Sequence, residues 1–305
     1  MTSLPLPPEN STDDFRQGSA CADAQTTHAN RENSAITTQL PPSDLIDPVR
    51  LSALLGEAGR RLNITAVAEC SSTSTLLLQS ASKGAPSGSV IVADRQTAGR
   101  GSRGRSWSAV PGTCLMFSLL WSFSGGLDRL SGLSLAAGVG IVEALSRCGI
   151  TPISLKWPND ILYENGKLGG TLIELCTKEK QAMAVIGIGL NMHLPGNIGE
   201  SCAAALPPAA LEQTGKPLPE RHILLARLLM SLTEVLDRFT AGGFPAVRDS
   251  WHTYHAWQDR RVRLLREGQS EQEVLCLGAD MDGALLIETP NGIERCLSGE
   301  VSLRP

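Results

Sequence analysis

The chain has 305 residues, 42% hydrophobic and 19% charged, and a formal net charge of −4, values typical of a globular protein. The negative charge argues against general nucleic-acid binding, and the absence of a long apolar run or a signal peptide argues against a membrane or secreted protein. Eight cysteines are scattered without a CxxC spacing, which favours free thiols over disulfides or a zinc site. We therefore expect a cytoplasmic protein with neither DNA nor a membrane as a partner.

The N-terminal part of the chain predicts a tail followed by a folded domain. Residues 1–43 are rich in Ser, Thr, Pro, Asn and Gln, and we expect a disordered polar tail without chemistry. Order is expected from residue 44 onward, in a domain spanning 44–258. Leucines at helical spacing predict a helix over 48–62, and Ile64–Ala68 predicts a short strand.

A run of hydroxyl side chains, 71–75, precedes the apolar residues 76–78. This order predicts the N-cap and start of a helix. Five consecutive hydroxyls exceed what one cap needs, so Ser72, Thr73 and Ser74 could also bind a polar ligand. Ordinary capping remains the alternative.

The segment 93–107 holds four arginines and three glycines between two apolar runs, 90–93 and 115–123, which are typical of strands. Arginine forks suit phosphate and carboxylate oxygens, and glycine lets the backbone approach a ligand. The segment thus predicts an anion-binding loop between two strands. The alternative is a solvated hairpin turn.

The middle of the chain predicts a buried helix and more strands. The helix covers 133–148, a strand covers 153–157, and a hairpin joins 161–163 to 167–175 through a turn. Residues 184–191 form a further buried strand whose glycines admit a ligand or a neighbouring backbone.

The remainder predicts a linker, helices and a small β domain. A Pro/Gly/Ala-rich connection, expected to be mobile, covers 192–219; a long helix follows over 221–239, and a helical connector over 251–257. Residues 259–305 are expected to form a small β-barrel or sandwich of short strands, at 261–265, 273–277, 284–288 and 293–297.

Two further motifs carry polar groups at the ends of buried strands. Lys156 lies beside Asn159 and Asp160, and Lys167 follows a turn and precedes two glycines. Carboxylate and amide oxygens suit Mg²⁺, and lysine suits phosphate oxygens. Singly, each lysine could be a surface residue and Asn159-Asp160 a simple turn. Together with the Gly/Arg loop they predict one site for an anionic ligand with phosphate and a metal.

The motifs Gln-Thr-Ala-Gly-Arg-Gly-Ser-Arg-Gly-Arg-Ser-Trp (96–107), Lys-Trp-Pro-Asn-Asp (156–160), Lys-Leu-Gly-Gly (167–170) and Gly-Ile-Gly-Leu-Asn (187–191) closely resemble the biotin protein ligase family, biotin–[acetyl-CoA-carboxylase] ligases. The resemblance covers about residues 45–305. It implies an α+β fold: a class II aminoacyl-tRNA synthetase-like mixed sheet with helices, plus a small C-terminal SH3-like β-barrel. It also implies an enzyme that makes biotinyl-5′-AMP from biotin and ATP. Biotin then passes to a lysine of biotin carboxyl carrier protein.

The resemblance also implies roles for individual residues. The expected catalytic residues are Lys167, Arg100 and Arg105, which would bind carboxylate and phosphate oxygens. The expected biotin-binding residues are Ser72, Thr73, Ser74, Gln96, Gly99, Arg100, Gly101, Ser102, Lys167 and Gly170. The expected ATP-binding residues are Arg103, Trp107, Lys156, Asn159 and Asn191, with Asp160 as the Mg²⁺ ligand. Adenylation needs positioning and charge stabilisation, not a protein nucleophile.

Three departures from the family pattern matter. Ser102 stands where the family usually has arginine, and we hypothesise a weaker hold on the adenylate. The polar tail has neither the length nor the apolar pattern of a helix-turn-helix domain, so we expect a ligase that does not repress. Residues 192–215 contain no Phe, Trp or Tyr, so an aromatic side chain cannot close over adenine from this segment.

Alternative hypotheses stay open at this point. A lipoate–protein ligase or an octanoyl/lipoyl transferase shares the fold and the carrier-lysine chemistry. A non-catalytic biotin-binding regulator and a generic nucleotide-binding module are further alternatives, the last weakened by the missing Gly-x4-Gly-Lys-Ser/Thr loop. The sequence leaves the oligomeric state open, and a homodimer is compatible with it.

Overall fold

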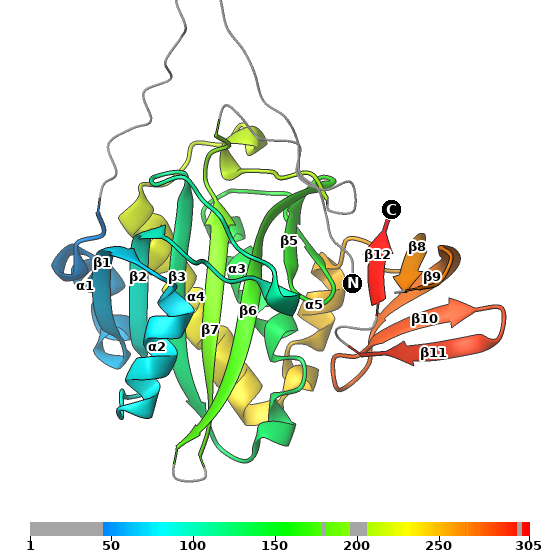
Figure 1. Cartoon of the computed structure of the whole chain (residues 1–305), viewed down its shortest axis with the longest axis horizontal. Coiled ribbons are helices and arrows are strands. Elements are labelled where there is room, and N and C mark those ends of the chain that lie inside the picture. The colour runs from blue at the N-terminus through cyan, green and yellow to red at the C-terminus, as the bar shows by residue number, and fades with distance from the viewer. Residues whose placement is uncertain (1–44, 179–180, 196–205, 267, 298–300) are drawn as a thin grey trace, which may run out of the picture. The chain divides into compact units, whose positions relative to one another are not determined.

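The computed structural model describes residues 45–178, 181–195, 206–266, 268–297 and 301–305 (Figure 1). The tail expected over 1–43 lies outside these residues. Among the described residues, no helix has the length and apolar character needed to cross a membrane.

A seven-stranded mixed sheet forms the centre of the larger domain, with the strand order β1-β2-β3-β7-β6-β5-β4. Strands β1 and β2 are parallel, and every other neighbouring pair is antiparallel. The strands are β1 Asn63–Cys70, β2 Ser89–Gln96, β3 Cys114–Phe123, β4 Ser154–Lys156, β5 Asp160–Tyr163, β6 Gly166–Lys178 and β7 Gln181–Asn191. The expected strands and the 161–175 hairpin are confirmed, with most strands longer than predicted.

Helices cover both faces of this sheet, α2 on one face and α3 with α4 on the other (Figure 1). The α-helices are α1 Pro48–Leu55, α2 Thr73–Ser82, α3 Leu133–Arg147, α4 Arg221–Gly242 and α5 Arg248–Tyr254. Short 3₁₀ helices are η1 Gly56–Arg61, η2 Ser102–Gly104, η3 Leu127–Leu130, η4 Leu211–Thr214 and η5 Phe244–Ala246. The predicted buried helix is confirmed as α3, which is apolar on nearly all sides because it lies between the sheet and α4.

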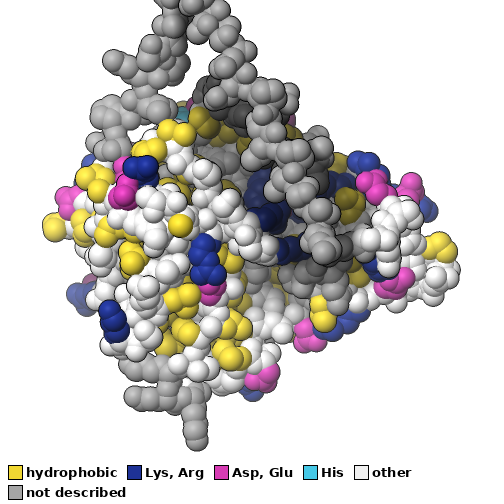
Figure 2. Space-filling view, in the orientation of Figure 1, with side chains coloured by type: hydrophobic (Ala, Val, Ile, Leu, Met, Phe, Trp, Pro, Cys, Tyr) yellow, Lys and Arg dark blue, Asp and Glu magenta, His cyan; other side chains and the backbone are white. Residues whose placement is uncertain are grey.

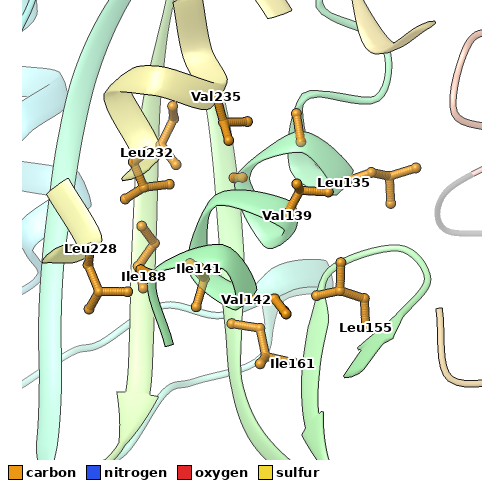
Figure 3. Close-up of a cluster of buried hydrophobic side chains, with 14 of the residues drawn as sticks. Leu135, Val139, Ile141, Val142, Leu155, Ile161, Ile188, Leu228, Leu232 and Val235 are labelled. Carbon is orange, nitrogen blue, oxygen red and sulfur yellow. The ribbon is translucent and has the colours of Figure 1, made fainter. Parts of the chain in front are cut away.

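The core on the α3 side joins residues that are far apart in the sequence (Figure 3). Val139 and Ile141 of α3 pack in one cluster with Leu232 of α4, and with Leu155 and Ile161 of β4 and β5. The strands that end at the polar motifs are therefore held by buried apolar contacts. This arrangement gives the motifs a rigid support.

Three expectations about local structure were partly wrong. The helix expected over 48–62 stops at Leu55, because Gly56 takes a left-handed φ of 54°, and a 3₁₀ helix continues the chain. The connector expected over 251–257 is helical over Arg248–Tyr254 instead. Residues 192–219 were expected to be mobile, but Ala210 and Leu211 are buried in the core; residues 196–205 of that connection lie outside the described residues.

A five-stranded antiparallel sheet follows, with the order β11-β10-β9-β8-β12. Its strands are β8 Arg260–Arg266, β9 Gln272–Ala279, β10 Leu285–Thr289, β11 Gly292–Cys296 and β12 Val301–Arg304. The fifth strand, β12, pairs with β8 and was not among the four strands predicted from local patterns. The α+β fold with a small C-terminal β domain is confirmed.

Candidate active site

A cavity of about 580 Å³ lies between the sheet, the N-terminus of α2 and the Gly/Arg loop. Figure 2 shows Lys and Arg side chains gathered in the hollow of this face, near the C-terminal strands. Most of the predicted site residues line the cavity: Ser72, Thr73, Ser74, Gln96, Arg100, Gly101, Ser102, Arg105, Trp107, Asn159, Lys167, Gly170 and Asn191. The structure thus brings together motifs that are more than a hundred residues apart in the sequence.

One end of the cavity is lined by hydroxyl groups. Ser72 is the N-cap of α2, as predicted, and its Oγ accepts a long bond of 3.5 Å from Thr75 N. The hydroxyls of Thr73 and Ser74 lie 2.8 and 3.0 Å from Ser118 Oγ on β3. Gln96 Oε1 accepts a 2.8 Å bond from Thr73 N. The capping and ligand-binding interpretations are compatible, because one hydroxyl caps and the next two form a buried polar network at the cavity wall.

The Gly/Arg loop forms a small hairpin, in which Arg100 and Ser106 make an antiparallel bridge. Trp107 N donates to Gly99 O at 2.8 Å, and Gly101 N donates to Arg105 O at 2.7 Å. A Cβ on Gly99 would lie 2.3 Å from Trp107 O, so a side chain at this position would clash with the backbone. Gly99 is not among the lining residues, and its small size serves the hairpin, while its expected contact with biotin stays a prediction.

Trp107 forms a wall of the cavity against β7. A Cβ on Gly189 would lie 2.6 Å from the indole ring, so the glycine is what allows the ring to rest on the strand. The ammonium of Lys167 lies 6.0 Å from the ring centroid. A flat aromatic surface therefore stands beside a cationic group, an arrangement that suits a nucleotide base and its phosphates.

The arginines of the loop do not act as one cluster. Arg105 lines the cavity and donates to the backbone and hydroxyl oxygens of Ser102, both at 3.3 Å. Arg103, expected on ATP, does not line the main cavity and donates a 2.8 Å bond to Val301 O of β12. Arg100, expected beside Lys167, lies 2.7 Å from Glu174 Oε1. The positions of the Arg100 and Arg103 side chains are set by partners in other parts of the protein. Spacing along the sequence could not predict these partners.

Asp160 lies between two lysines. Its Oδ2 accepts a 2.9 Å bond from Lys156 Nζ, and its Oδ1 lies 2.5 Å from Lys167 Nζ. Burial raises the pKa of Asp160, but the two positive charges outweigh burial and hold that pKa below its usual value. Burial lowers the pKa of Lys156 despite the carboxylate beside it. The carboxylate therefore holds two ammonium groups in place at the start of β5.

The expected Mg²⁺ role of Asp160 has no direct support in this geometry. Both carboxylate oxygens face ammonium groups, and Asp160 lines a small cleft beside the main cavity, as Lys156 does. Within the described ranges, no three His, Cys, Asp or Glu side chains are grouped to hold a metal ion. The carboxylate is thus paired with lysines in this structure, and the small cleft shares Asn159 and Lys167 with the main cavity. The expected roles of Asp160 on Mg²⁺ and of Lys156 on ATP stay predictions.

Lys167 is the cation best placed in the cavity. A Cβ on Gly170 would lie 3.6 Å from its Nζ, so the ammonium lies over the glycine of the same strand. Its backbone N donates to Pro207 O at 2.7 Å, and its carbonyl accepts from Ala209 N at 2.8 Å. The lysine is thus fixed at both its backbone and its charged end.

The two asparagines line the cavity but use their amides to hold backbone. Asn159 Nδ2 donates to Thr171 O at 2.8 Å. Asn191 Nδ2 donates to Ala209 O at 2.9 Å, and its Oδ1 accepts from Cys114 Sγ at 3.1 Å. These bonds hold the backbone that forms the cavity walls. The expected contact of the asparagines with ATP stays a prediction.

Three features of the site were not predicted from the sequence. Ser118 is a polar residue within an apolar strand, and Glu174 is a charged residue among the apolar positions of another; both breaks in pattern were signals that could have been used. The segment 206–209 pairs with Lys167 through backbone bonds and left no signal in its side chains.

Comparisons with known proteins show the family of the chain. Residues 67–191 match the model of the biotin/lipoate A/B protein ligase family, and residues 259–304 match the biotin protein ligase C-terminal domain. The chain is 33% identical to the bifunctional ligase/repressor BirA of Salmonella typhimurium over 86% of this chain and 80% of that one. It is also 33% identical to the biotin–[acetyl-CoA-carboxylase] ligase of Mycobacterium tuberculosis over 74% of this chain and 82% of that one.

A solved structure shows the same likeness. The biotin protein ligase from Aquifex aeolicus in complex with biotin and ATP is 32% identical, with a TM-score of 0.65, over 79% of this chain and 98% of that chain. With the shared fold, the two matching domain models and these identities, the chain belongs to the biotin protein ligase family.

Proposed function

We propose that the protein is a biotin–[acetyl-CoA-carboxylase] ligase. The biotin carboxylate attacks the α-phosphorus of ATP, giving biotinyl-5′-AMP and pyrophosphate. The ε-amine of a carrier-protein lysine then attacks the acyl carbon, forming an amide and releasing AMP and a proton. The observation that carries the proposal is a single cavity with a hydroxyl-lined end, a fixed ammonium and an aromatic wall.

Each end of the cavity suits one part of the substrates. The hydroxyls of Thr73 and Ser74, with Gln96, supply donors and acceptors for a ureido ring. Trp107 offers its face to the adenine base, and Lys167 and Arg105 lie where carboxylate and phosphate oxygens meet. The two substrates repel one another as anions, so these cations lower the cost of bringing them into contact.

Positioning provides the catalysis in this proposal. Lys167 is held by Asp160 and by backbone bonds, so its charge is in place before the substrates arrive. Mg²⁺ enters as part of the Mg-ATP substrate and is held mainly by the phosphates, because Mg²⁺ keeps several waters and takes few protein ligands. A biotin carboxyl carrier protein is the acceptor; a homodimer and a cytoplasmic location remain predictions.

The test is incubation of the protein with biotin, Mg-ATP and a biotin carboxyl carrier domain, followed by mass spectrometry of the acceptor. We expect a mass gain of one biotinyl group on one lysine, with pyrophosphate released. Excess lipoate should not compete, which separates the proposal from a lipoate ligase. A Lys167→Met variant should lose the activity, whereas Lys216→Met, at an exposed lysine outside the cavity, should keep it.

Absence of acceptor modification, under conditions in which a known biotin ligase works, would overturn the proposal. Biotin binding without pyrophosphate release would instead indicate the non-catalytic biotin-binding regulator.

A further inference from the structure

Glu174 and Arg100 join the Gly/Arg loop to the central sheet. Arg100 lies in the hairpin that covers the cavity, and its Nη1 is 2.7 Å from Glu174 Oε1 on β6. Glu174 itself is not among the residues that line the cavity. The guanidinium therefore reaches across the cavity rim and closes the hairpin onto the strand.

The position of Glu174 along β6 shows which end of the cavity the pair closes. Side chains alternate along a strand, so Glu174 shares a face with Gly170 and Leu172. Leu172 lines the cavity and pairs with Gly187, where a Cβ would lie 2.5 Å from Ser74 Oγ. The Arg100–Glu174 pair thus stands next to the hydroxyl-lined end.

The same register separates the pair from the catalytic lysine. Glu174 comes four residues after Gly170, which corresponds to about 13 Å along a strand. Lys167 Nζ lies over Gly170. In this arrangement Arg100 is paired with a carboxylate nearer the hydroxyl-lined end than the lysine is, which favours a role for it in holding the hairpin.

The stability of the Glu174 carboxylate in its largely buried position depends on Arg100. The side chain of Glu174 is only 17% exposed, and its Oε2 is buried without a hydrogen-bond partner in the described part of the chain. A largely buried carboxylate with one unpaired oxygen is costly unless a cation stays beside it. The side chain of Arg100 is 48% exposed, so the pair can open. When it opens, the largely buried Glu174 carboxylate is left without a cation beside it. The closed hairpin is therefore the favoured state.

We propose that Glu174 is a positioning residue of the ligase: it holds Arg100 across β6 and keeps the Gly/Arg hairpin closed over bound biotin. This role rests on the proposed function, because the molecule retained is biotin. It differs from a competing role in which the biotin carboxylate displaces Glu174 from Arg100. The two roles predict opposite effects of removing the Glu174 carboxylate. If Glu174 holds the hairpin closed, its removal speeds the release of biotin. If Glu174 competes with biotin for Arg100, its removal tightens biotin binding.

The test measures biotin dissociation from the full chain by stopped-flow fluorescence, with Trp107 as the reporter in the cavity. For Glu174→Gln we expect dissociation about fivefold faster than in the unmodified chain, the upper value for a half-exposed ion pair. Added salt should speed release from the unmodified chain and leave the variant nearly unchanged. Glu174→Asp, which keeps the charge, should restore part of the retention.

A control is Glu69→Gln, which removes a more exposed pair with Arg95, of nearly the same length at 2.8 Å, between β1 and β2 and outside the cavity. It should leave the release rate unchanged. Arg100→Lys, which keeps a cation but loses the planar fork, should speed release as Glu174→Gln does, and it covers the case in which the glutamine variant fails to fold.

Slower release or tighter binding of biotin in Glu174→Gln would overturn the proposal that Glu174 holds the hairpin closed. It would show instead that Glu174 competes with biotin for Arg100. An unchanged rate with an unchanged melting temperature would also overturn it. Absence of biotin binding by the unmodified chain would instead overturn the proposed function, so the two failures are distinguishable.

Discussion

The indole Nε1 of Trp157 donates a 3.0 Å hydrogen bond to the carbonyl oxygen of Gly283. Trp157 belongs to the Lys-Trp-Pro-Asn-Asp motif, and Gly283 lies in the turn between β9 and β10. A Cβ on Gly283 would lie 2.7 Å from Gly132 Cα at the start of α3, so the turn is packed tightly there. The C-terminal domain is thus tied directly to the segment that carries Asp160.

Replacing Trp157 by Phe should weaken this contact between the Lys-Trp-Pro-Asn-Asp motif and the C-terminal domain. The variant loses the indole donor and some packing volume, so we expect a loss of about 2 kcal/mol in unfolding free energy. We also expect pyrophosphate release to be several times slower, because the motif that carries Asp160 loses its support. Denaturant unfolding and a pyrophosphate assay measure the two effects.

Trp121→Phe is the control for this prediction. Trp121 is also buried, on β3, and its ring lies 5.0 Å from the Arg61 guanidinium, outside the cavity. It should lower stability without slowing pyrophosphate release. Equal activities of the Trp157 variant and the unmodified chain would show that the tie serves stability alone.

Replacing Asp160 by Asn should release both lysines. Lys156 is buried, with a side chain 7% exposed, so it would be left as a buried cation without its partner. We expect a loss of about 3 kcal/mol in stability and a large drop in adenylate formation.

Raising the Mg²⁺ concentration should not restore the activity. Restoration by Mg²⁺ would mean that Asp160 is a metal ligand after all. Asp128→Asn, at an exposed position, is the matched control.

Replacing Ser102 by Arg tests the hypothesis that this chain holds its adenylate weakly. Ser102 lines the cavity, so an arginine there could add a charge-assisted bond to the ligand. We expect release of biotinyl-5′-AMP to slow about tenfold. Rapid filtration of labelled adenylate measures the rate, and biotin attached to free lysines of an added protein measures leakage.

Ser102→Ala separates this effect from the bond that Ser102 Oγ accepts from Arg105. If the arginine variant and the unmodified chain release the adenylate equally fast, the hypothesis is wrong.

His255 should make the protein less stable in mild acid. Burial, together with the charge of His252, lowers the pKa of His255 to about 3, and its ring stacks on Trp251 at 4.4 Å. An unfolded histidine binds a proton near pH ~6.5, whereas the folded one stays neutral. The unfolding free energy should therefore be unaffected by this group above pH ~6.5 and fall by about 1.4 kcal/mol per pH unit below it, down to about pH 3.

Unfolding by urea at about pH 7.5, 5.5 and 4.5 measures this dependence. Acidic groups with lowered pKa values, Asp160 and Asp280 among them, add their own loss at lower pH. His255→Phe isolates the histidine, because it keeps the aromatic contact and cannot be protonated. A stability that falls equally with pH in both chains would contradict the prediction.

Local patterns in the sequence were enough to predict most of the secondary structure. The apolar runs of β2, β3 and β7 and the all-round apolar helix α3 were predicted because burial on both faces leaves continuous apolar sequence. The end of α1 at Leu55 was missed because leucine spacing continues past the glycine that stops the helix. Strand β12 was missed because its pairing with β8 is a long-range contact.

The sequence by itself, through motifs that resemble those of a known family, predicted most of the residues that meet in one cavity, Thr73, Trp107, Lys167 and Gly170 among them. Only the tertiary structure decided which partner each charged side chain meets. Arg100 pairs with Glu174, Arg103 with a carbonyl of β12, and Asp160 with two lysines. The physical reason is that ion pairs depend on distances across strands and domains, and residue types along the chain do not encode those distances.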